Sequence, residues 1–290
     1  MRTLQGKSVV ITGAASGIGE ALAHASAARG ARLLLADIDA LGLDRVVSSL
    51  KAVGIECSGL VTDTGNEAAI YALAQEAQVR LGGADVVINN AGVGLLAPVD
   101  KLRTTDAQWL MNINFWGVVH GCQAFIPQLR QRPDAVLVNI SSIFAMVSVP
   151  TQSIYNASKA AVRGFSDALR EELQSSGIGV LCVHPGGIKT NIVNRARITD
   201  VSMVADTDQE MRDNFERLAR TTPQQAAMVI IRAIESRKTR VLIGADATFM
   251  DLVFRLFPSH ASHWFSNMGQ WMRHRAAAKA RTTQSRDKTV

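Results

Sequence analysis

Short apolar runs alternate along the chain with longer segments in which apolar residues recur at helical spacing. The apolar runs are too short for helices and are typical of strands buried on both faces of a sheet. Strands that alternate with helices indicate right-handed βαβ units and a parallel sheet covered by helices on both sides. The predicted strands are 8–12, 32–37, 56–61, 85–89, 135–141, 179–184 and 239–243. The predicted helices are 17–29, 40–53, 66–81, 104–130, 153–176 and 223–236.

This order predicts an α/β protein with a doubly wound, Rossmann-type parallel sheet of about seven strands in a three-layer α/β/α arrangement. No linker or repeat interrupts it, so we expect one domain over residues 1–246. Within this domain the mixed, mostly polar segment 188–222 is expected to form a helical flap over the substrate. Residues 247–290 are predicted to form a C-terminal helical extension followed by a basic tail.

Composition and charge narrow the class of protein. Hydrophobic residues make up 47% and charged residues 19% of the chain, as in globular proteins with a large core. Residues 271–290 hold six basic residues and one acidic residue, a net +5 of the total +6. The remainder is close to neutral, which argues against a nucleic-acid partner. No apolar run of eighteen residues and no signal-peptide pattern occurs, and we expect a cytoplasmic location.

The cysteines do not indicate a disulfide framework or a metal site. Cys57, Cys122 and Cys182 are odd in number and widely spaced. Reduced, mostly buried thiols are the expected state. No close pair of cysteines or histidines is present, so no zinc or other metal site is predicted.

A glycine-rich turn joins the first predicted strand to the first predicted helix. Its glycines would let the backbone approach a pyrophosphate, which the N–H groups and the partial positive charge of a helix N-terminus would bind. The candidate cofactor-binding residues of this turn are Gly13, Ser16, Gly17, Ile18 and Gly19.

Two acidic residues follow the second and third strands. Asp37 lies eighteen residues after Gly19, where a carboxylate can accept hydrogen bonds from both ribose hydroxyls of an adenosine. It would repel a 2′-phosphate, and neither Ser16 nor Ile38 beside it is basic, so NAD is favoured over NADP as the cofactor. Asp63 is a candidate for the adenine edge, but an ordinary helix N-cap explains it almost as well.

Asparagine residues occur in two further segments that are candidates for the functional site. Asn90, Ala91 and Gly92 end the fourth strand, where small residues would let the cofactor lie close, although such residues also form ordinary turns. Asn112 and Asn114 interrupt an apolar helical segment. Buried amides need hydrogen-bond partners, so one of the two is expected to have a structural or solvent-relay role; the sequence does not indicate which.

The strongest candidate chemistry lies between residues 142 and 159. Tyr155 and Lys159 are four residues apart, which places both on one face of a helix. Ser142 directly follows a predicted buried strand. A hydroxyl, a phenol and an ammonium group would then meet where a strand ends and a helix begins, as proton transfer to a carbonyl group requires.

Taken in order, these motifs resemble the short-chain dehydrogenase/reductase family in its single-domain branch. The resemblance extends from about residue 7 to residue 190, and no catalytic position departs from the family pattern. It implies an NAD(P)-dependent oxidoreductase that interconverts a secondary alcohol and a ketone, or an alcohol and an aldehyde. It also implies a homodimer or homotetramer. The matching motifs are Thr12-Gly13-x-x-x-Gly17-Ile18-Gly19, Asn89-Asn90-Ala91-Gly92, Asn114, Ser142, Tyr155-x-x-x-Lys159 and Pro185-Gly186 with Thr190.

The resemblance also implies a role for each residue. Tyr155 would be the general acid/base and Ser142 would polarise the carbonyl oxygen. Lys159 would hold the nicotinamide ribose and lower the pKa of the tyrosine, and Asn114 would hold a water molecule in a proton relay. The segment that contains Pro185, Gly186, Ile188 and Thr190 would bind the nicotinamide end of the cofactor.

Electrostatics supports a lowered tyrosine pKa. Free tyrosine has a pKa of about 10, too high for a base at neutral pH. An ammonium group about 4 Å away at an effective dielectric near 20 contributes up to roughly 4 kcal/mol. This energy corresponds to a lowering of the Tyr155 pKa by as much as about three units, close to the working pH.

The sequence is compatible with more than one substrate and with more than one role for the C-terminal extension. Apolar segments at 93–96 and 143–145 are expected to line the pocket and favour a hydrophobic alcohol or ketone, although the same residues could serve packing. The alternative function is a non-catalytic dinucleotide-binding sensor or scaffold on the same fold. The extension could close the pocket or a subunit interface, make peripheral contact with a membrane through apolar and basic residues, or end in a disordered tail.

Overall fold

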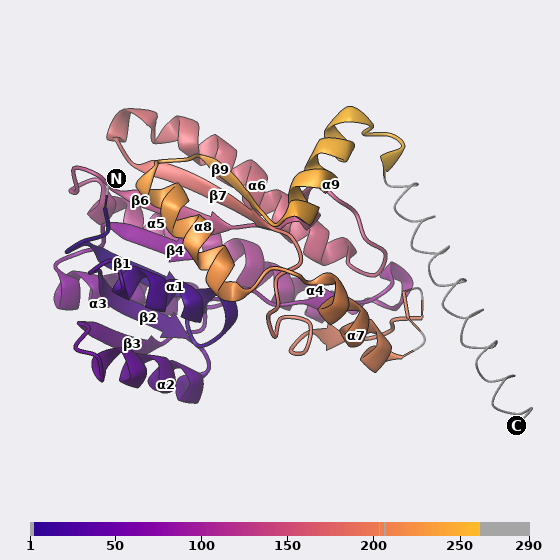
Figure 1. Cartoon of the computed structure of the whole chain (residues 1–290), viewed down its shortest axis with the longest axis horizontal. Coiled ribbons are helices and arrows are strands. Elements are labelled where there is room, and N and C mark those ends of the chain that lie inside the picture. Colours follow the sequence, from indigo (N-terminus) through magenta and orange to yellow (C-terminus); the bar gives the residue numbers. More distant parts are fainter. Residues whose placement is uncertain (1–2, 203, 206, 262–290) are drawn as a thin grey trace, which may run out of the picture.

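The computed structural model describes residues 3–261 apart from residues 203 and 206. Its centre is a seven-stranded parallel sheet in the order β3-β2-β1-β4-β6-β7-β9, with helices on both faces (Figure 1). The predicted doubly wound Rossmann-type sheet is therefore confirmed. The strands are β1 (Ser8–Thr12), β2 (Arg32–Asp37), β3 (Cys57–Val61), β4 (Val86–Asn89), β6 (Val136–Ile140), β7 (Gly179–Pro185) and β9 (Arg240–Ile243).

The strand order reverses beside β1, and this reversal sets the position of the site. From β1 the chain builds outward to β3, then returns to place β4 on the other side of β1. Ile11 of β1 pairs with Leu35 on one side and with Ile88 on the other. Loops leaving β1 and β4 diverge at such a switch point and open a crevice at the carboxyl ends of the strands.

Alternate side chains of each strand enter the two layers of the core. Val9 and Ile11 pack against the helices on one face of the sheet, whereas Val10 between them packs against the helices on the other face. Both faces of the strand are buried, which explains the continuous apolar run in the sequence. The helices are α1 (Gly17–Ala27), α2 (Ala40–Lys51), α3 (Glu67–Leu81), α4 (Thr104–Met111), α5 (Gly117–Leu129), α6 (Ser153–Glu172), α7 (Asp208–Leu218), α8 (Pro223–Glu235) and α9 (Ala245–Leu256).

The predicted helix over residues 104–130 is helical from Thr104 to Leu129, but it is not a single α-helix. A π-helical turn at Asn112–Trp116 separates α4 from α5. After this turn Gly117 lies against the loop that follows β3, where a methyl group would come within 2.7 Å of the carbonyl oxygen of Thr64. The helical apolar pattern continues through the turn, so spacing alone could not reveal it.

The flap combines strand and helix. Its first part forms β8 (Arg197–Ile198), which pairs in parallel with β5 (Leu95–Leu96), and its second part forms α7. Arg197 donates to Asp106 and lies 3.7 Å from the centroid of the Trp109 ring, which ties the flap to α4. The expected helical flap over 188–222 is therefore only partly helical.

The C-terminal extension begins with α9, which packs on the main body. Ala247 is fully buried against Ile143 and Val147, in the segment that follows Ser142. The basic tail lies outside the described residues. In the part of the chain that the structure describes, the three cysteines are buried and free, and no helix is long and apolar enough to cross a membrane.

Candidate active site

A cavity of about 350 Å³ opens at the carboxyl ends of the strands. It is lined by the predicted cofactor-binding and catalytic residues except Gly19 and Asn114, which lie behind its wall. The lining residues among those predicted are Gly13, Ser16, Gly17, Ile18, Asp37, Asp63, Asn90, Ala91, Gly92, Ser142, Tyr155, Lys159, Pro185, Gly186, Ile188 and Thr190.

The glycine turn is held close to the loop after β4. Gly13 has a φ of 67°, and a methyl group on it would lie 2.8 Å from the Cα atom of Ala91. A methyl group on Gly19 would lie 2.0 Å from the carbonyl oxygen of Gly13. Gly19 thus allows α1 to approach the turn and does not itself face the cavity. Ser16 is the N-cap residue of α1, but its side chain makes no capping hydrogen bond.

Asp37 is fixed at the end of β2 by the backbone beside it. One carboxylate oxygen accepts from the Ala15 N–H and the other from the Asp39 N–H, both at 2.9 Å. Its oxygens keep further lone pairs toward the cavity. The interpretation of Asp63 as a helix N-cap was wrong, because α3 is capped by Asn66. Asp63 instead accepts from the Gly65 N–H at 2.8 Å and lines the cavity.

Asn90 braces the glycine turn. Its side-chain amide donates to the carbonyl oxygens of Thr12 at 2.9 Å and Gly13 at 3.1 Å. The Thr12 hydroxyl in return accepts from the N–H groups of Asn90 and Ala91. The sequence motif at residues 89–92 therefore joins two loops that are nearly eighty residues apart, a structural role that the glycine-turn argument alone did not reveal.

Ser142, Tyr155 and Lys159 meet on one side of the cavity, as their spacing predicted. Lys159 is buried, donates to the carbonyl oxygen of Ile140 at 3.0 Å, and lies 5.8 Å from the centroid of the Tyr155 ring. The side chain of Ser142 forms a hydrogen bond that lowers the tyrosine pKa. Its backbone is extended, and its hydroxyl also accepts from the Phe144 N–H at 3.1 Å.

The expected lowering of the Tyr155 pKa was wrong. Burial raises the pKa of Tyr155 to about 12, and the hydrogen bond from Ser142 only partly opposes it. Burial also lowers the pKa of Lys159 to about 8, since its ammonium group is surrounded by protein. The Nζ atom donates to the carbonyl oxygen of Ile140. Burial thus favours the neutral form of both groups, the phenol of Tyr155 and the amine of Lys159.

Asn114, rather than Asn112, is the buried amide. Its side chain accepts from the Val93 N–H at 2.8 Å and donates to the Val93 carbonyl oxygen at 3.0 Å. It lies directly behind Gly92, where an added methyl group would be 3.3 Å from Asn114 Oδ1 and 3.4 Å from Lys159 Nζ. The π-helical turn carries this amide to within reach of both Val93 and Ser158.

The loop at 185–190 is held from an unexpected side. The carboxylate of Asp246, at the start of α9, accepts from the Gly187 N–H at 2.7 Å. Methyl groups on Gly186 or Gly244 would come within 2.4 Å of this carboxylate. Asp246 follows the last strand of the sheet, so the argument that singled out Asp37, an acid at a strand's carboxyl end, could have found it too.

The deeper wall of the cavity is apolar. Residues 93–96 line it, as predicted, together with Phe144 from the segment after Ser142 and Ile192 and Phe215 from the flap. Ile143 was wrongly expected on this wall, because its side chain points into the cluster with Val147 and Ala247. Ala145 is also absent from the wall. The sequence did not identify Arg195 of the flap, which lines the cavity and lies 3.3 Å from Asp39.

Among the described residues, no cluster of three or more histidine, cysteine or acidic side chains is arranged to hold a metal ion. The site does suit a dinucleotide. The glycine turn leaves backbone exposed where a Cβ atom would collide with the neighbouring loop, and an uncapped helix N-terminus faces the cavity beside the Asp37 carboxylate.

Comparison with known proteins defines the class. The family model for short chain dehydrogenases matches residues 7–200. SadH from Mycobacterium tuberculosis is 38% identical over 262 residues, covering 89% of this chain and 94% of that protein. The ketoacyl reductase HetN from Nostoc sp. is 30% identical, covering 85% of this chain and 81% of that protein. The chain therefore belongs to the short-chain dehydrogenase/reductase family and is an oxidoreductase that binds NAD or NADP.

Solved structures agree with this assignment. A short-chain dehydrogenase/reductase from Burkholderia phymatum, crystallised in complex with NAD, superposes with a TM-score of 0.78 at 31% identity, covering 88% of this chain and 96% of that chain. A short-chain dehydrogenase from Streptomyces avermitilis superposes with a TM-score of 0.76 at 26% identity, covering 94% of this chain and 99% of that chain. Both likenesses extend well beyond the cofactor-binding half.

Proposed function

We propose that this oxidoreductase interconverts a hydrophobic secondary alcohol and the corresponding ketone, or an alcohol and an aldehyde. The observation that carries the proposal is the convergence of Ser142, Tyr155 and Lys159 beside an apolar wall at the end of a dinucleotide cleft. A nicotinamide dinucleotide, when bound, would accept or supply the hydride. The residues around it would orient the substrate and move the proton.

In the reducing direction Tyr155 gives its phenol proton to the substrate oxygen, and in the oxidising direction it takes that proton back. The high pKa of the phenol supports the first role, because it keeps the proton on Tyr155 across the neutral range. Ser142 donates a hydrogen bond to the same oxygen. The buried Lys159 ammonium stabilises the phenolate that forms, and the Asn114 amide supports the relay behind Gly92.

The cofactor is proposed to be NAD rather than NADP. Asp37 is held with its carboxylate at the cavity, where it would accept from ribose hydroxyls and repel a phosphate. Arg195 also lines the cavity, but its guanidinium group forms an ion pair with the Asp39 carboxylate. Direct titration of the protein with NADH and with NADPH would test the preference. Equal or tighter binding of NADPH would contradict it.

The decisive test of the activity uses Tyr155→Phe and a panel of aliphatic ketones and alcohols. We expect turnover to fall by about 10²-fold or more, because the proton donor is lost, with NADH affinity nearly unchanged. The matched control is Tyr71→Phe, which removes the only other tyrosine, an exposed residue of α3. A Tyr155→Phe variant with full turnover would refute the proposal. A wild-type protein that binds NADH but turns over no member of the panel would favour the sensor or scaffold function.

We also propose that α9 makes peripheral contact with an anionic lipid surface. Phe249, Leu252 and Leu256 share one face of the helix and are each more than half exposed, opposite the face that carries Ala247 and Asp251. The sequence that follows adds aromatic residues and six cations at 271–290.

The full chain should therefore sediment with vesicles of phosphatidylcholine and phosphatidylserine at low salt, and Leu252→Asp should weaken this binding. Leu41→Asp, at an exposed leucine of α2, is the control. No vesicle binding by the full chain would contradict the proposal. A homodimer or homotetramer, a cytoplasmic location and the division of the chain at residue 246 stay predictions.

A further inference from the structure

His184 lies near the end of β7 and is almost completely buried. Its Nδ1 atom is 3.3 Å from the carbonyl oxygen of Ser142. A carbonyl oxygen can only accept, so Nδ1 must carry the hydrogen of the ring, and Nε2 must then be a bare acceptor. The same carbonyl oxygen also accepts from the Ala145 N–H at 3.1 Å, so the histidine supplies its second hydrogen bond.

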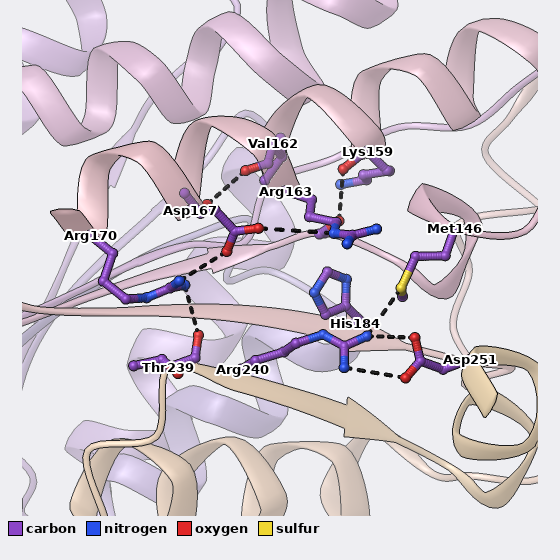
Figure 2. A network of polar contacts seen from close by, with 12 residues as sticks. Met146, Lys159, Val162, Arg163, Asp167, Arg170, His184, Thr239, Arg240 and Asp251 are labelled. Atoms are coloured by element: carbon purple, nitrogen blue, oxygen red, sulfur yellow. Dashed lines mark hydrogen bonds and ion pairs between the residues drawn. The ribbon is translucent and has the colours of Figure 1, made fainter. Parts of the chain in front are cut away.

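The other side of the ring faces Arg240, the first residue of β9. Figure 2 shows the imidazole between the guanidinium groups of Arg163 and Arg240, of which the latter binds Asp251 of α9. Among the described residues, His184 Nε2 and Arg240 Nε are both buried without a hydrogen-bond partner. The first is an acceptor and the second a donor, so one water molecule between them would satisfy both.

Asp251 fixes the guanidinium from the far side. Its two oxygens lie 2.6 and 3.2 Å from the terminal nitrogens of Arg240, a two-point contact that orients the planar group. Met146 Sδ lies 3.1 Å from the same guanidinium. Asp251 is buried on the inner face of α9, whereas Arg255, its second partner at 3.1 Å, is exposed. Substitutions of Arg240, the partner on the inner side of Asp251, and of Arg255, its exposed partner, can therefore be compared.

We propose that His184 is a positioning residue for Ser142, held in its orientation by Arg240 and Asp251, so that the C-terminal extension sets the geometry of the candidate catalytic serine. The inference rests on the proposed role of Ser142. It gives α9 a function inside the site, in addition to the apolar contact of Ala247 with Ile143. None of His184, Arg240 and Asp251 lines the cavity. The effect passes through the Ser142 backbone.

The test exploits the presence of only two tyrosines in the chain. In a Tyr71→Phe background labelled with ¹³C at the tyrosine Cζ, the single NMR resonance reports the hydrogen bonding of the Tyr155 phenol without any substrate. Ser142→Ala provides the reference displacement of this resonance. His184→Leu, which removes the donor, should move the resonance in the same direction. His184→Asn can keep a donor near the Ser142 carbonyl and should restore the original position.

Arg240→Met and Arg255→Met form the matched pair for the outer part of the chain of contacts. We expect Arg240→Met to displace the Tyr155 resonance by a fraction of the His184→Leu effect and Arg255→Met to leave it unchanged. Turnover of the best ketone in the panel should follow the same order, with kcat falling more than KM rises. Loss of the equivalent of one hydrogen bond corresponds to a decrease in kcat of about fivefold.

The outcomes separate the inference from the proposed function. If Ser142→Ala leaves both the resonance and the turnover unchanged, the proposed role of Ser142 fails. If Ser142→Ala changes them while the folded His184 and Arg240 variants do not, only the inference fails. If His184→Leu does not fold, ¹⁵N NMR of the histidine rings in the wild-type protein tests the inference by identifying the tautomer of His184. The His184→Asn variant, which lacks this signal, assigns it. An Nδ1–H tautomer is expected, and an Nε2–H tautomer would overturn the inference.

Discussion

On the side of the cavity built by β1, β2 and β4, the loops meet so closely that no side chain fits between them, and the Asn90 and Asp37 side chains brace them. On the side built by β6, β7 and β9, side chains from distant segments hold them. Gly19 and Gly13 illustrate the first kind, since neither has room for a methyl group. Asp246 and His184 illustrate the second, with hydrogen bonds that span 59 and 42 residues of sequence.

The difference affects how each side should respond to substitution. A backbone contact cannot be adjusted by a change of rotamer, so its loss displaces a loop as a unit. A side-chain contact can often be replaced in part by another group of similar shape. We therefore expect abrupt losses around the glycine turn and graded, rescuable losses around the loops held by Asp246 and His184.

Gly19→Ala should have the largest effect. The new methyl group would lie 2.0 Å from the Gly13 carbonyl oxygen and 2.7 Å from the Asn90 amide, so the turn and α1 must separate. Overpacking of this kind costs about 3 kcal/mol or more of unfolding free energy, and NADH affinity should fall with it. Urea unfolding and fluorescence titration measure the two effects. Gly164→Ala, at an exposed helical glycine with open space, should instead stabilise by about 0.5–1 kcal/mol.

The same contrast explains what the sequence could predict. Each strand of the large sheet was predicted to within one residue at either end, because continuous apolar runs follow from burial on both faces. The glycine turn and the Tyr155–Lys159 pair depend on spacings of a few residues, and the structure brings them to one cavity. The π-helical turn and His184 depend on contacts between distant segments, for which a single sequence has no local signal. Asp246 does follow a strand, as Asp37 does, but its bond to the Gly187 N–H is also a long-range contact. The Tyr155 pKa was misjudged for the same reason, since burial is a tertiary property.

Acidification should lower the stability of the protein through His184, on the side of the cavity built by β6, β7 and β9. Burial lowers the pKa of His184 to about 4, whereas an unfolded histidine titrates near 6.5. Between these values the unfolded chain binds the additional proton, so this contribution to stability is complete above pH 6.5 and is lost as the pH falls toward 4. Arg240 and Arg163 disfavour the charged ring, and Asp167 favours it.

The expected loss is about 3 kcal/mol of unfolding free energy across this interval. We would measure denaturant unfolding of the wild type and of His184→Asn at a series of pH values. Comparison of the two proteins separates the contribution of His184 from the titration of other groups. The stability difference between the two proteins should shrink as the pH falls. A difference that stays constant from pH 7 to pH 4 would show that the ring is not buried in its neutral form.

Asp246→Ala should have an intermediate effect that a conservative change reverses. The substitution leaves the Gly187 N–H without its acceptor, and a lost partner of this kind costs about 1–3 kcal/mol. NADH affinity should fall by about tenfold as the 185–190 loop loosens. Asp246→Asn keeps a carbonyl acceptor of the same length and should recover most of the affinity. Equal affinities for the Ala variant and the wild type would mean that the loop needs no support from α9.

The smallest effect is expected at the contact between the flap and the adenosine side of the cleft. Arg195 lies 3.3 Å from the Asp39 carboxylate, and the side chains keep 58% and 34% of their surface exposed. An ion pair this accessible contributes about 0–1 kcal/mol and is screened by salt. Arg195→Met should therefore accelerate NADH dissociation by at most about fivefold at low ionic strength, with no change at high ionic strength.

Asp39→Asn completes a double-mutant cycle for this contact, because asparagine caps a helix as well as aspartate and should leave the start of α2 intact. The two single variants and the double variant should release NADH at similar rates if the ion pair alone restrains the flap. If Arg195→Met accelerates release and Asp39→Asn does not, Arg195 acts directly on the bound dinucleotide, and its role in cofactor choice would have to be reconsidered. Stopped-flow measurement of NADH release at two salt concentrations distinguishes these results.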